Sequence, residues 1–148
     1  MSCLSKCEAC PLRLAHDDLS WRFDQMATRR IRPAAMTDED AIGAYIMAMP
    51  DDVRRRRYHY PCSAEYACES RIQQFRECPP DDWHHLELII ELPCGAIGGV
   101  CHAYELTGLG HHDVGISISP ELAGRGAGRQ LLSAMERYAR ECGHVQRL

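Results

Sequence analysis

The stretch Ser119–Ala139, SPELAGRGAGRQLLSAMERYA, places three glycines (Gly124, Gly126 and Gly128) directly before a helical pattern. A glycine inside a helix costs about 1 kcal/mol relative to alanine, so this placement needs a reason. A strand over 113–119 precedes the glycines and a helix over 127–142 follows them. The predicted buried stripe of that helix consists of Leu131, Leu132, Met135, Tyr138, Ala139 and Cys142.

A strand, a glycine-rich turn and a helix N-terminus together favour the binding of an anionic phosphate. The first amides of the helix lack intrahelical partners, the helix dipole attracts negative charge, and glycine leaves room for the ligand. The P-loop is excluded because no glycine is followed by Lys and then Ser or Thr. A dinucleotide fingerprint is disfavoured because the spacing is G-x-G-x-G and the strands before it are antiparallel.

The turn resembles the acyl-CoA signature of the GNAT N-acetyltransferase superfamily, Q/R-x-x-G-x-G/A. Residues 123–128, AGRGAG, match it at both small-residue positions, whereas the first position is Ala123. The resemblance extends from about residue 28 to the C-terminus. It also covers the order of the predicted elements, β-α-α-β-β-β-α-β.

The resemblance implies acetyl-CoA as co-substrate, with pantetheine bound by the strand and pyrophosphate bound by the amides of the turn. The implied residues are Ile116, Ser117, Ile118, Ala123, Gly124, Arg125, Gly126, Ala127, Gly128 and Arg129. The side chains of Arg125 and Arg129 either add positive charge to this site or are simply solvated.

The resemblance also implies a carboxylate that deprotonates the amine acceptor, directly or through water. Asp113 occupies the family's frequent position for this base, and Glu105 is the second candidate. His111 and His112 rank third, because loop histidines are commonly plain surface groups. The amide of Ile116 is the expected donor to the oxyanion.

Five further helices and strands are predicted before the glycine turn. A short edge strand in 29–34 precedes a helix that Thr37 caps, with Asp40 as its capping-box partner and Pro50 as its end. Residues 51–63 are expected to be a connection, and Ser63 caps a helix over 64–76. Strands over 84–92 and 96–106 form a hairpin.

Arg54 to Arg57, within this connection, is the strongest basic run of the chain. It either contacts an acidic group, such as the 3′-phosphate of CoA or an acidic partner, or forms a solvated helix end.

These elements predict an α+β fold of the GNAT type, with a mostly antiparallel sheet flanked by helices. Residues 1–25 are expected to be a cysteine-containing extension and 26–148 the GNAT domain. A further strand begins near His144, and the sequence ends within it at Leu148. The last strands of the family's sheet are therefore expected to be missing. An open sheet edge favours a homodimer.

Composition narrows the partners. The chain of 148 residues carries a net charge of −4, which argues against nucleic acid as the main partner. No apolar run is long enough to span a membrane and no secretory signal is evident, so we expect a cytoplasmic protein.

Cys3, Cys7 and Cys10 have the spacing C-x₃-C-x₂-C. This is a weak metal signal without a second matched pair, and no metal ligands are assigned.

The function favoured by these observations is transfer of an acetyl group from acetyl-CoA to a primary amine of a small molecule or a protein lysine. The alternative is a weakly active or inactive acyl-CoA-binding domain with a regulatory role. A third hypothesis is a cysteine-rich metal-binding protein built on the same fold.

Overall fold

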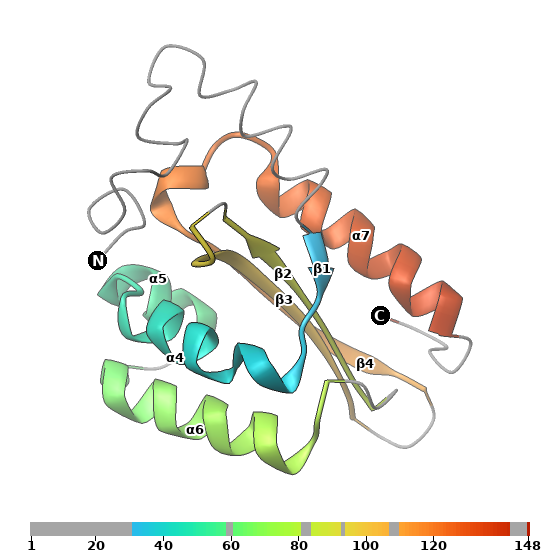
Figure 1. Cartoon of the computed structure of the whole chain (residues 1–148), viewed down its shortest axis with the longest axis horizontal. Helices are drawn as coiled ribbons and strands as arrows, with labels where there is room; N and C mark the ends of the chain where they lie inside the picture. The colour runs from blue at the N-terminus through green and yellow to red at the C-terminus, as the bar shows by residue number, and fades with distance from the viewer. Residues whose placement is uncertain (1–30, 59–60, 81–83, 93, 107–109, 143–147) are drawn as a thin grey trace.

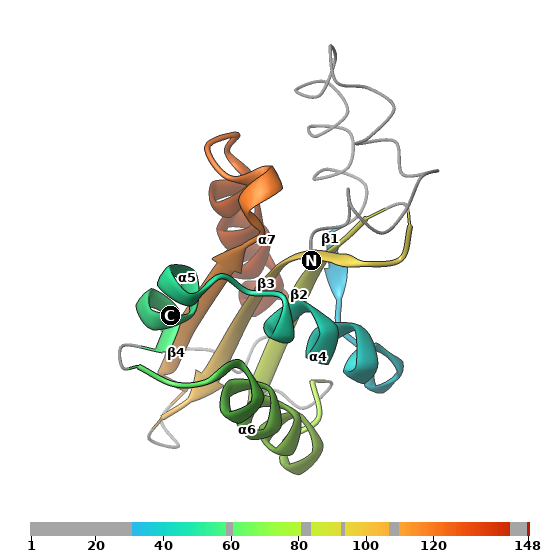
Figure 2. The same cartoon turned by 90° about the vertical axis from the view of Figure 1, so that its left-hand side faces the viewer.

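A computed structural model describes residues 31–58, 61–80, 84–92, 94–106, 110–142 and 148 of the chain. The elements are β1 (Ile31–Pro33), η2 (Met36–Asp38), α4 (Glu39–Met47), α5 (Asp51–Tyr58), α6 (Ala64–Glu77), β2 (His85–Glu91), β3 (Ile97–Glu105), β4 (His112–Ile118), η3 (Pro120–Leu122) and α7 (Ala127–Cys142). The four strands form one antiparallel sheet in the order β1-β2-β3-β4. Helix α7 covers one face, and α4 and α6 cover the other (Figures 1 and 2). The predicted α+β class is therefore confirmed.

The two faces of the sheet follow from strand alternation, which sends successive side chains to opposite sides. Leu86, Leu88 and Ile90 of β2 pack with Leu131 and Met135 of α7. Residues between them in sequence, such as Ile89, pack with α4 and α6 on the opposite face. The two central strands, β2 and β3, therefore contribute to two separate cores, whereas the apolar side chains of β4 pack only on the α7 side.

Helix α7 confirms the predicted range 127–142. Leu131 and Met135 are fully buried, and Ala139 is nearly so. Leu132 was expected in the same stripe, but its exposed fraction is 39%. It lies one residue beyond Leu131, and the rotation of about 100° between them turns it away from the sheet.

Helix α6 and the central hairpin also confirm the predictions made from the sequence. The Ser63 hydroxyl accepts a hydrogen bond from the amide of Tyr66 at 3.1 Å and so caps α6. Strands β2 and β3 pair as an antiparallel hairpin, with an irregularity of register between Ile90 and Glu91.

The predicted cap at Thr37 with Asp40 is wrong. The chain enters α4 through η2, and Asp38 is the residue at the N-cap position. The carboxylate of Asp38 accepts the amide of Ala35 at 2.7 Å. An aspartate three residues after a free amide satisfies that donor, so the first turn begins at Ala35, two residues before the predicted cap at Thr37.

The predicted connection over 51–63 is also wrong for its first part, which forms helix α5. Asp51 and Asp52 lie in its first turn and three arginines in its last turn, so the charges complement the helix dipole. Arg54 is buried rather than solvated. It donates to the carbonyl of Cys62 at 2.7 Å and pairs with Asp51 at 2.5 Å.

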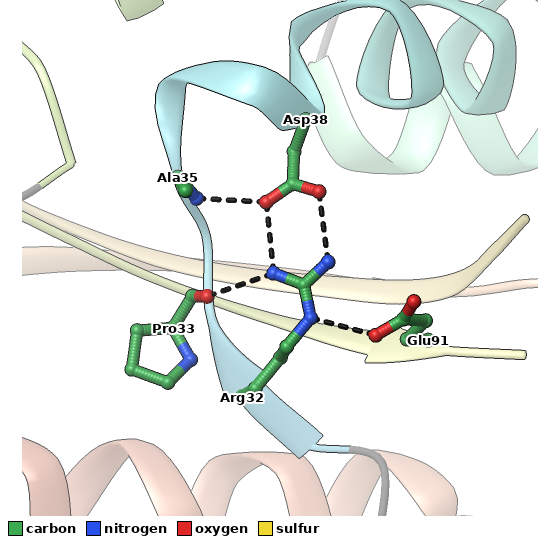
Figure 3. A network of polar contacts seen from close by, with 5 residues as sticks. All are labelled: Arg32, Pro33, Ala35, Asp38 and Glu91. Carbon is green, nitrogen blue, oxygen red and sulfur yellow. Dashed lines mark hydrogen bonds and ion pairs between the residues drawn. The ribbon is translucent and has the colours of Figure 1, made fainter. Parts of the chain in front are cut away.

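Arg32 ties β1 to both neighbouring elements (Figure 3). Its guanidinium donates to both oxygens of Asp38 at 2.9 and 2.8 Å, and to Glu91 of β2 at 2.7 Å. Arg32 Nη1 also donates to the carbonyl of Pro33. The bonds from Arg32 hold the pKa of Asp38 below its ordinary value of 3.8.

Arg32→Gln is expected to lower the free energy of unfolding at pH 7 by about 1–2 kcal/mol, because partial exposure screens these charged hydrogen bonds. Asp38 has a lowered pKa, so its contribution is present above pH 4 and is lost as the pH falls through the folded value. Urea unfolding at pH 7 and about pH 3 measures both effects. Arg55→Gln, which removes an exposed charge on α5, is the control. An equal loss at both pH values would contradict the ionic origin.

Several predictions concern residues outside the described part of the chain. These are the extension over 1–25 with Cys3, Cys7 and Cys10, the domain boundary at 26, and most of the final strand from His144 onward. Among the described residues, no helix is long and apolar enough to cross a membrane. The same residues contain no group of three or more His, Cys, Asp or Glu side chains that could hold a metal ion.

Candidate active site at the edge of β4

A groove of about 610 Å³ runs along β4 on the side that faces away from β3. This volume is in the range of small-molecule sites. Helix α5 lies beside β4 (Figure 2), and four of its residues line the groove. The lining residues are Pro50, Asp52, Val53, Arg56, Arg57, Ile116, Ser117, Ile118, Pro120 and Ala123.

At alternate residues of β4, backbone groups that have no strand partner among the described residues face this groove. The amide of Ser119 donates a hydrogen bond to the carbonyl of Gly98 at 2.9 Å, and the amide of Leu106 donates one to the carbonyl of His111 at 2.9 Å. These bonds flank an unbroken antiparallel register, so the odd-numbered residues between them are the ones bonded to β3. The amides and carbonyls of Ile116 and Ile118 therefore face the groove, whereas those of Ser117 face β3.

The side chain of Ser117 has a different role. Its hydroxyl accepts a hydrogen bond from Tyr45 at 2.9 Å, which ties α4 to the edge strand. Burial raises the pKa of Tyr45 to about 12, so its hydroxyl keeps its proton at neutral pH.

The glycine turn leads from the end of the groove into α7. Gly124 and Gly126 have φ angles of +74° and +83°, a region that other residues adopt at a cost. Gly128 has no such constraint, and a Cβ there would meet only Ile118 at an ordinary 3.8 Å. The backbone thus requires the first two glycines, whereas the third is not required by the described structure.

The first turn of α7 presents amides ahead of the helix ladder. The bond from Gln130 to the carbonyl of Gly126 at 3.0 Å opens that ladder. The amides of Ala127, Gly128 and Arg129 come before it and have no place in the i to i−4 pattern. The side chain of Arg125 is exposed, and Arg129 lines a separate hollow between β1 and α7.

The two predicted catalytic carboxylates lie on opposite faces of the sheet. Asp113 pairs with Tyr104 in register, and its exposed side chain shares the α4–α6 face with Gly115 and Ser117. Glu105 belongs to the α7 face, and its side chain is 5% exposed. The candidates therefore cannot act together on one substrate.

Glu105 already has partners, one in the loop that follows β3 and one directly before β2. Its carboxylate accepts the amide of Gly110 at 3.1 Å and contacts His84. Desolvation raises the pKa of Glu105, but the Gly110 amide and His84 more than offset it, so the net pKa lies below the ordinary value. The third-ranked pair separates as well, since His111 is exposed and His112 is buried with its ring nitrogen 3.1 Å from the carbonyl of Gly110.

A buried polar cluster on the α4–α6 face was not anticipated. Its central contact joins Arg71 of α6 to Glu87 of β2 at 2.5 Å. His85 lies 2.8 Å from the other oxygen of Glu87, and Arg71 donates to the hydroxyl of Tyr104 at 2.9 Å. The rings of His85 and Tyr104 stack with centroids 4.2 Å apart. The sequence signal was the alternation of polar residues in HLELIIE and CHAYE, which marks a polar stripe on one face.

Arg57 extends this cluster to β4. Its Nη2 lies 2.6 Å from Nε2 of His102 and packs against Gly115, where a Cβ would come within 2.2 Å. Burial lowers the pKa of His102 well below its ordinary value, and the charge of Arg57 adds to this effect. The solvated interpretation of the basic run is therefore wrong for Arg57 as well as for Arg54.

The fold has clear counterparts among solved structures. The GNAT domain of S. lividans PAT superposes with a TM-score of 0.61 at 17% identity, covering 75% of this chain and 65% of that one. Spermidine/spermine N-acetyltransferase SpeG from Vibrio cholerae gives 0.52 at 15% identity, with 81% and 66% covered. The PaiA N-acetyltransferase of Thermoplasma acidophilum, solved in complex with coenzyme A, gives 0.53 at 17% identity, with 76% and 72% covered.

This chain therefore has the GNAT fold, and it spans 65% of the length of the S. lividans domain. The model of the acetyltransferase (GNAT) family matches residues 55–148, which is more than half of the chain. The chain belongs to the acetyltransferase (GNAT) family. No curated protein matches its sequence.

Proposed function

We propose that this chain binds acetyl-CoA along β4 and transfers its acetyl group to a primary amine. The observation that carries the proposal is the groove beside β4, into which Ile116 and Ile118 direct backbone groups that no described strand pairs with. A pantetheine arm carries amides and can hydrogen-bond to such an edge as a peptide strand does.

The glycine turn and the start of α7 supply the pyrophosphate site in this proposal. The amides of residues 124–129 point a partial positive charge at the ligand, and the absence of side chains at the glycines permits close approach. Arg125 adds a charge from the turn. Arg129 contributes its amide, because its side chain lines the other hollow.

The chemistry in this proposal uses the face of β4 that carries Asp113. Asp113 takes a proton from the acceptor ammonium, directly or through one water, and the amine nitrogen attacks the thioester carbonyl carbon. The outward-facing amide of Ile116 donates to the resulting oxyanion. A C–N bond forms, the C–S bond breaks, and the departing CoA thiolate takes up the second proton that the attacking nitrogen loses as it becomes an amide.

The comparisons support the co-substrate and leave the acceptor open. One similar structure is a complex with coenzyme A, and another is a spermidine/spermine N-acetyltransferase. At 15% identity we do not carry the polyamine over to this chain.

Titration calorimetry with acetyl-CoA, followed by mass spectrometry of acceptor amines after incubation, tests the proposal. Mass spectrometry is needed because the nine cysteines of the chain would themselves consume a thiol reagent. Acetylated product supports an acetyltransferase. Binding without product across a panel of amines would support the non-catalytic acyl-CoA-binding domain instead. No binding at millimolar acetyl-CoA would overturn both.

Gly128→Ala is expected to keep or raise the melting temperature while weakening CoA binding about tenfold. The protein has room for the methyl group, and alanine favours the helix, so a loss of affinity would come from contact with the ligand. Gly43→Ala, in α4, is the matched control because its Cβ would meet Cys68 Sγ at an ordinary 3.5 Å. Unchanged CoA affinity in Gly128→Ala would mean that the pyrophosphate does not bind next to Gly128.

A further inference from the structure

The guanidinium of Arg57 lies half-buried against the sheet, over a residue that has no side chain. Gly115 leaves the space it occupies, since a Cβ there would lie 2.2 Å from Nη2 and 2.5 Å from Cζ. Its ring neighbours are His102, at 2.6 Å from Nη2 to Nε2, and Tyr58, whose centroid is 5.3 Å from Cζ. Arg57 is thus fixed at β4 by packing and by one neutral acceptor.

No carboxylate of the described residues lies within ion-pair distance of Arg57. Other arginines that are at least partly buried do have such a partner: Arg54 pairs with Asp51, and Arg71 pairs with Glu87. His102 cannot take this role, because an imidazole is either neutral or positively charged; its lowered pKa favours the neutral ring, which accepts a hydrogen bond but brings no negative charge. A desolvated cation without a counter-ion is costly, so an incoming anion gains more here than at the surface.

The groups around Arg57 do not offset its positive charge. Behind it, Glu87 is shared between Arg71 and His85, which leaves no spare negative charge. In the groove, Arg56 stands next to Arg57, and Asp52 is already paired with Arg56 at 3.1 Å. Asp113 acts on Arg57 through space but lies beyond ion-pair distance. This arrangement disfavours an acceptor that carries several positive charges.

We propose that Arg57 binds the carboxylate of the acceptor, so that the substrate is an amino acid rather than a polyamine. This inference rests on the proposed acetyltransferase function. A guanidinium can bind a carboxylate through two parallel hydrogen bonds. In an amino acid the amine is one carbon away from that carboxylate, so binding at Arg57 brings the amine to the strand that carries Asp113.

The test compares acceptors that differ only in the carboxylate: phenylalanine with phenethylamine, and lysine with 1,5-diaminopentane. Wild-type protein is expected to acetylate the carboxylate-bearing member with a kcat/KM about 10- to 100-fold higher. In Arg57→Gln this ratio should fall at least tenfold, mainly through KM, while CoA affinity changes less than threefold. Arg55→Gln on the same helix is the control, and Arg57→Lys should keep part of the preference.

A second readout does not require turnover. Calorimetry with N-acetylphenylalanine and N-phenethylacetamide, with and without CoA, should detect the carboxylate-bearing product only, and Arg57→Gln should abolish its binding. Equal use of both acceptors, or failure of N-acetylphenylalanine to bind, overturns this inference. A parallel loss of CoA affinity in Arg57→Gln would place the arginine at CoA instead and also overturns it. Failure of acetyl-CoA to bind wild-type protein refutes the proposed function, which is a separate result.

Discussion

Glu87→Gln is expected to lower the free energy of unfolding by about 3–5 kcal/mol at pH 7, the typical result of removing one partner from a buried ion pair. Glu87 and His85 are fully buried, and Arg71 is 4% exposed. The carboxylate lies 2.5 Å from Arg71 and 2.8 Å from His85. Glutamine would leave Arg71 without a negative partner in the core.

The effect should depend on pH in a defined direction. Burial raises the pKa of Glu87, but His85 and Arg71 together lower it by a larger amount, so the net pKa lies below the ordinary value. The stabilisation is therefore complete above the unfolded pKa of about 4.3 and is lost as the pH falls through the folded value. The difference between wild type and Glu87→Gln should narrow below about pH 4.

Guanidinium chloride unfolding followed by circular dichroism at pH 7 and about pH 3.5 measures this difference. Glu136→Gln, on the exposed side of α7, is the matched control and should change the free energy by less than about 0.5 kcal/mol. In a double-mutant cycle, Arg71→Met combined with Glu87→Gln should lose less than the sum of the single changes. A loss under about 1 kcal/mol for Glu87→Gln would mean that water reaches the pair.

Asp113→Asn is expected to reduce kcat about 100- to 10,000-fold with little change in acetyl-CoA affinity, because it removes the proposed general base and leaves the groove intact. Asp113 is exposed at the start of β4, so the amide should not disturb folding. Rates at saturating acetyl-CoA, with product measured by mass spectrometry, give the effect. Asp40→Asn, an exposed aspartate in the first turn of α4, is the control.

The other carboxylate makes this experiment decisive. Glu105 accepts a hydrogen bond from the amide of Gly110 and contacts His84. Glu105→Gln should therefore weaken these two contacts and lower stability, while most of the wild-type kcat is retained. If Glu105→Gln abolishes turnover while Asp113→Asn retains it, the roles of the two carboxylates are reversed.

Local patterns predicted much of the fold. The 3.6-residue stripe located α7, a serine before a helical pattern located the start of α6, and two alternating segments located the hairpin. These features depend on residues close together in sequence, and local propensity and periodicity therefore describe them. Segment 51–58 was missed because its mean hydropathy is low and the side chain that packs on Gly115 of β4 is Arg57 rather than an aliphatic residue.

The sequence by itself determined the family-like succession of strand, glycine turn and helix, and it predicted that the residues of β4 and the turn bind the co-substrate. Only the tertiary structure decided which of these groups face the groove. The register with β3 turns Ile116 and Ile118 outward and Ser117 inward. Only folding brings Arg57, Arg71, Glu87 and His102 together, because they come from two helices and two strands. A strand pattern specifies a face, but the partner of a buried charge depends on which distant segment packs onto that face.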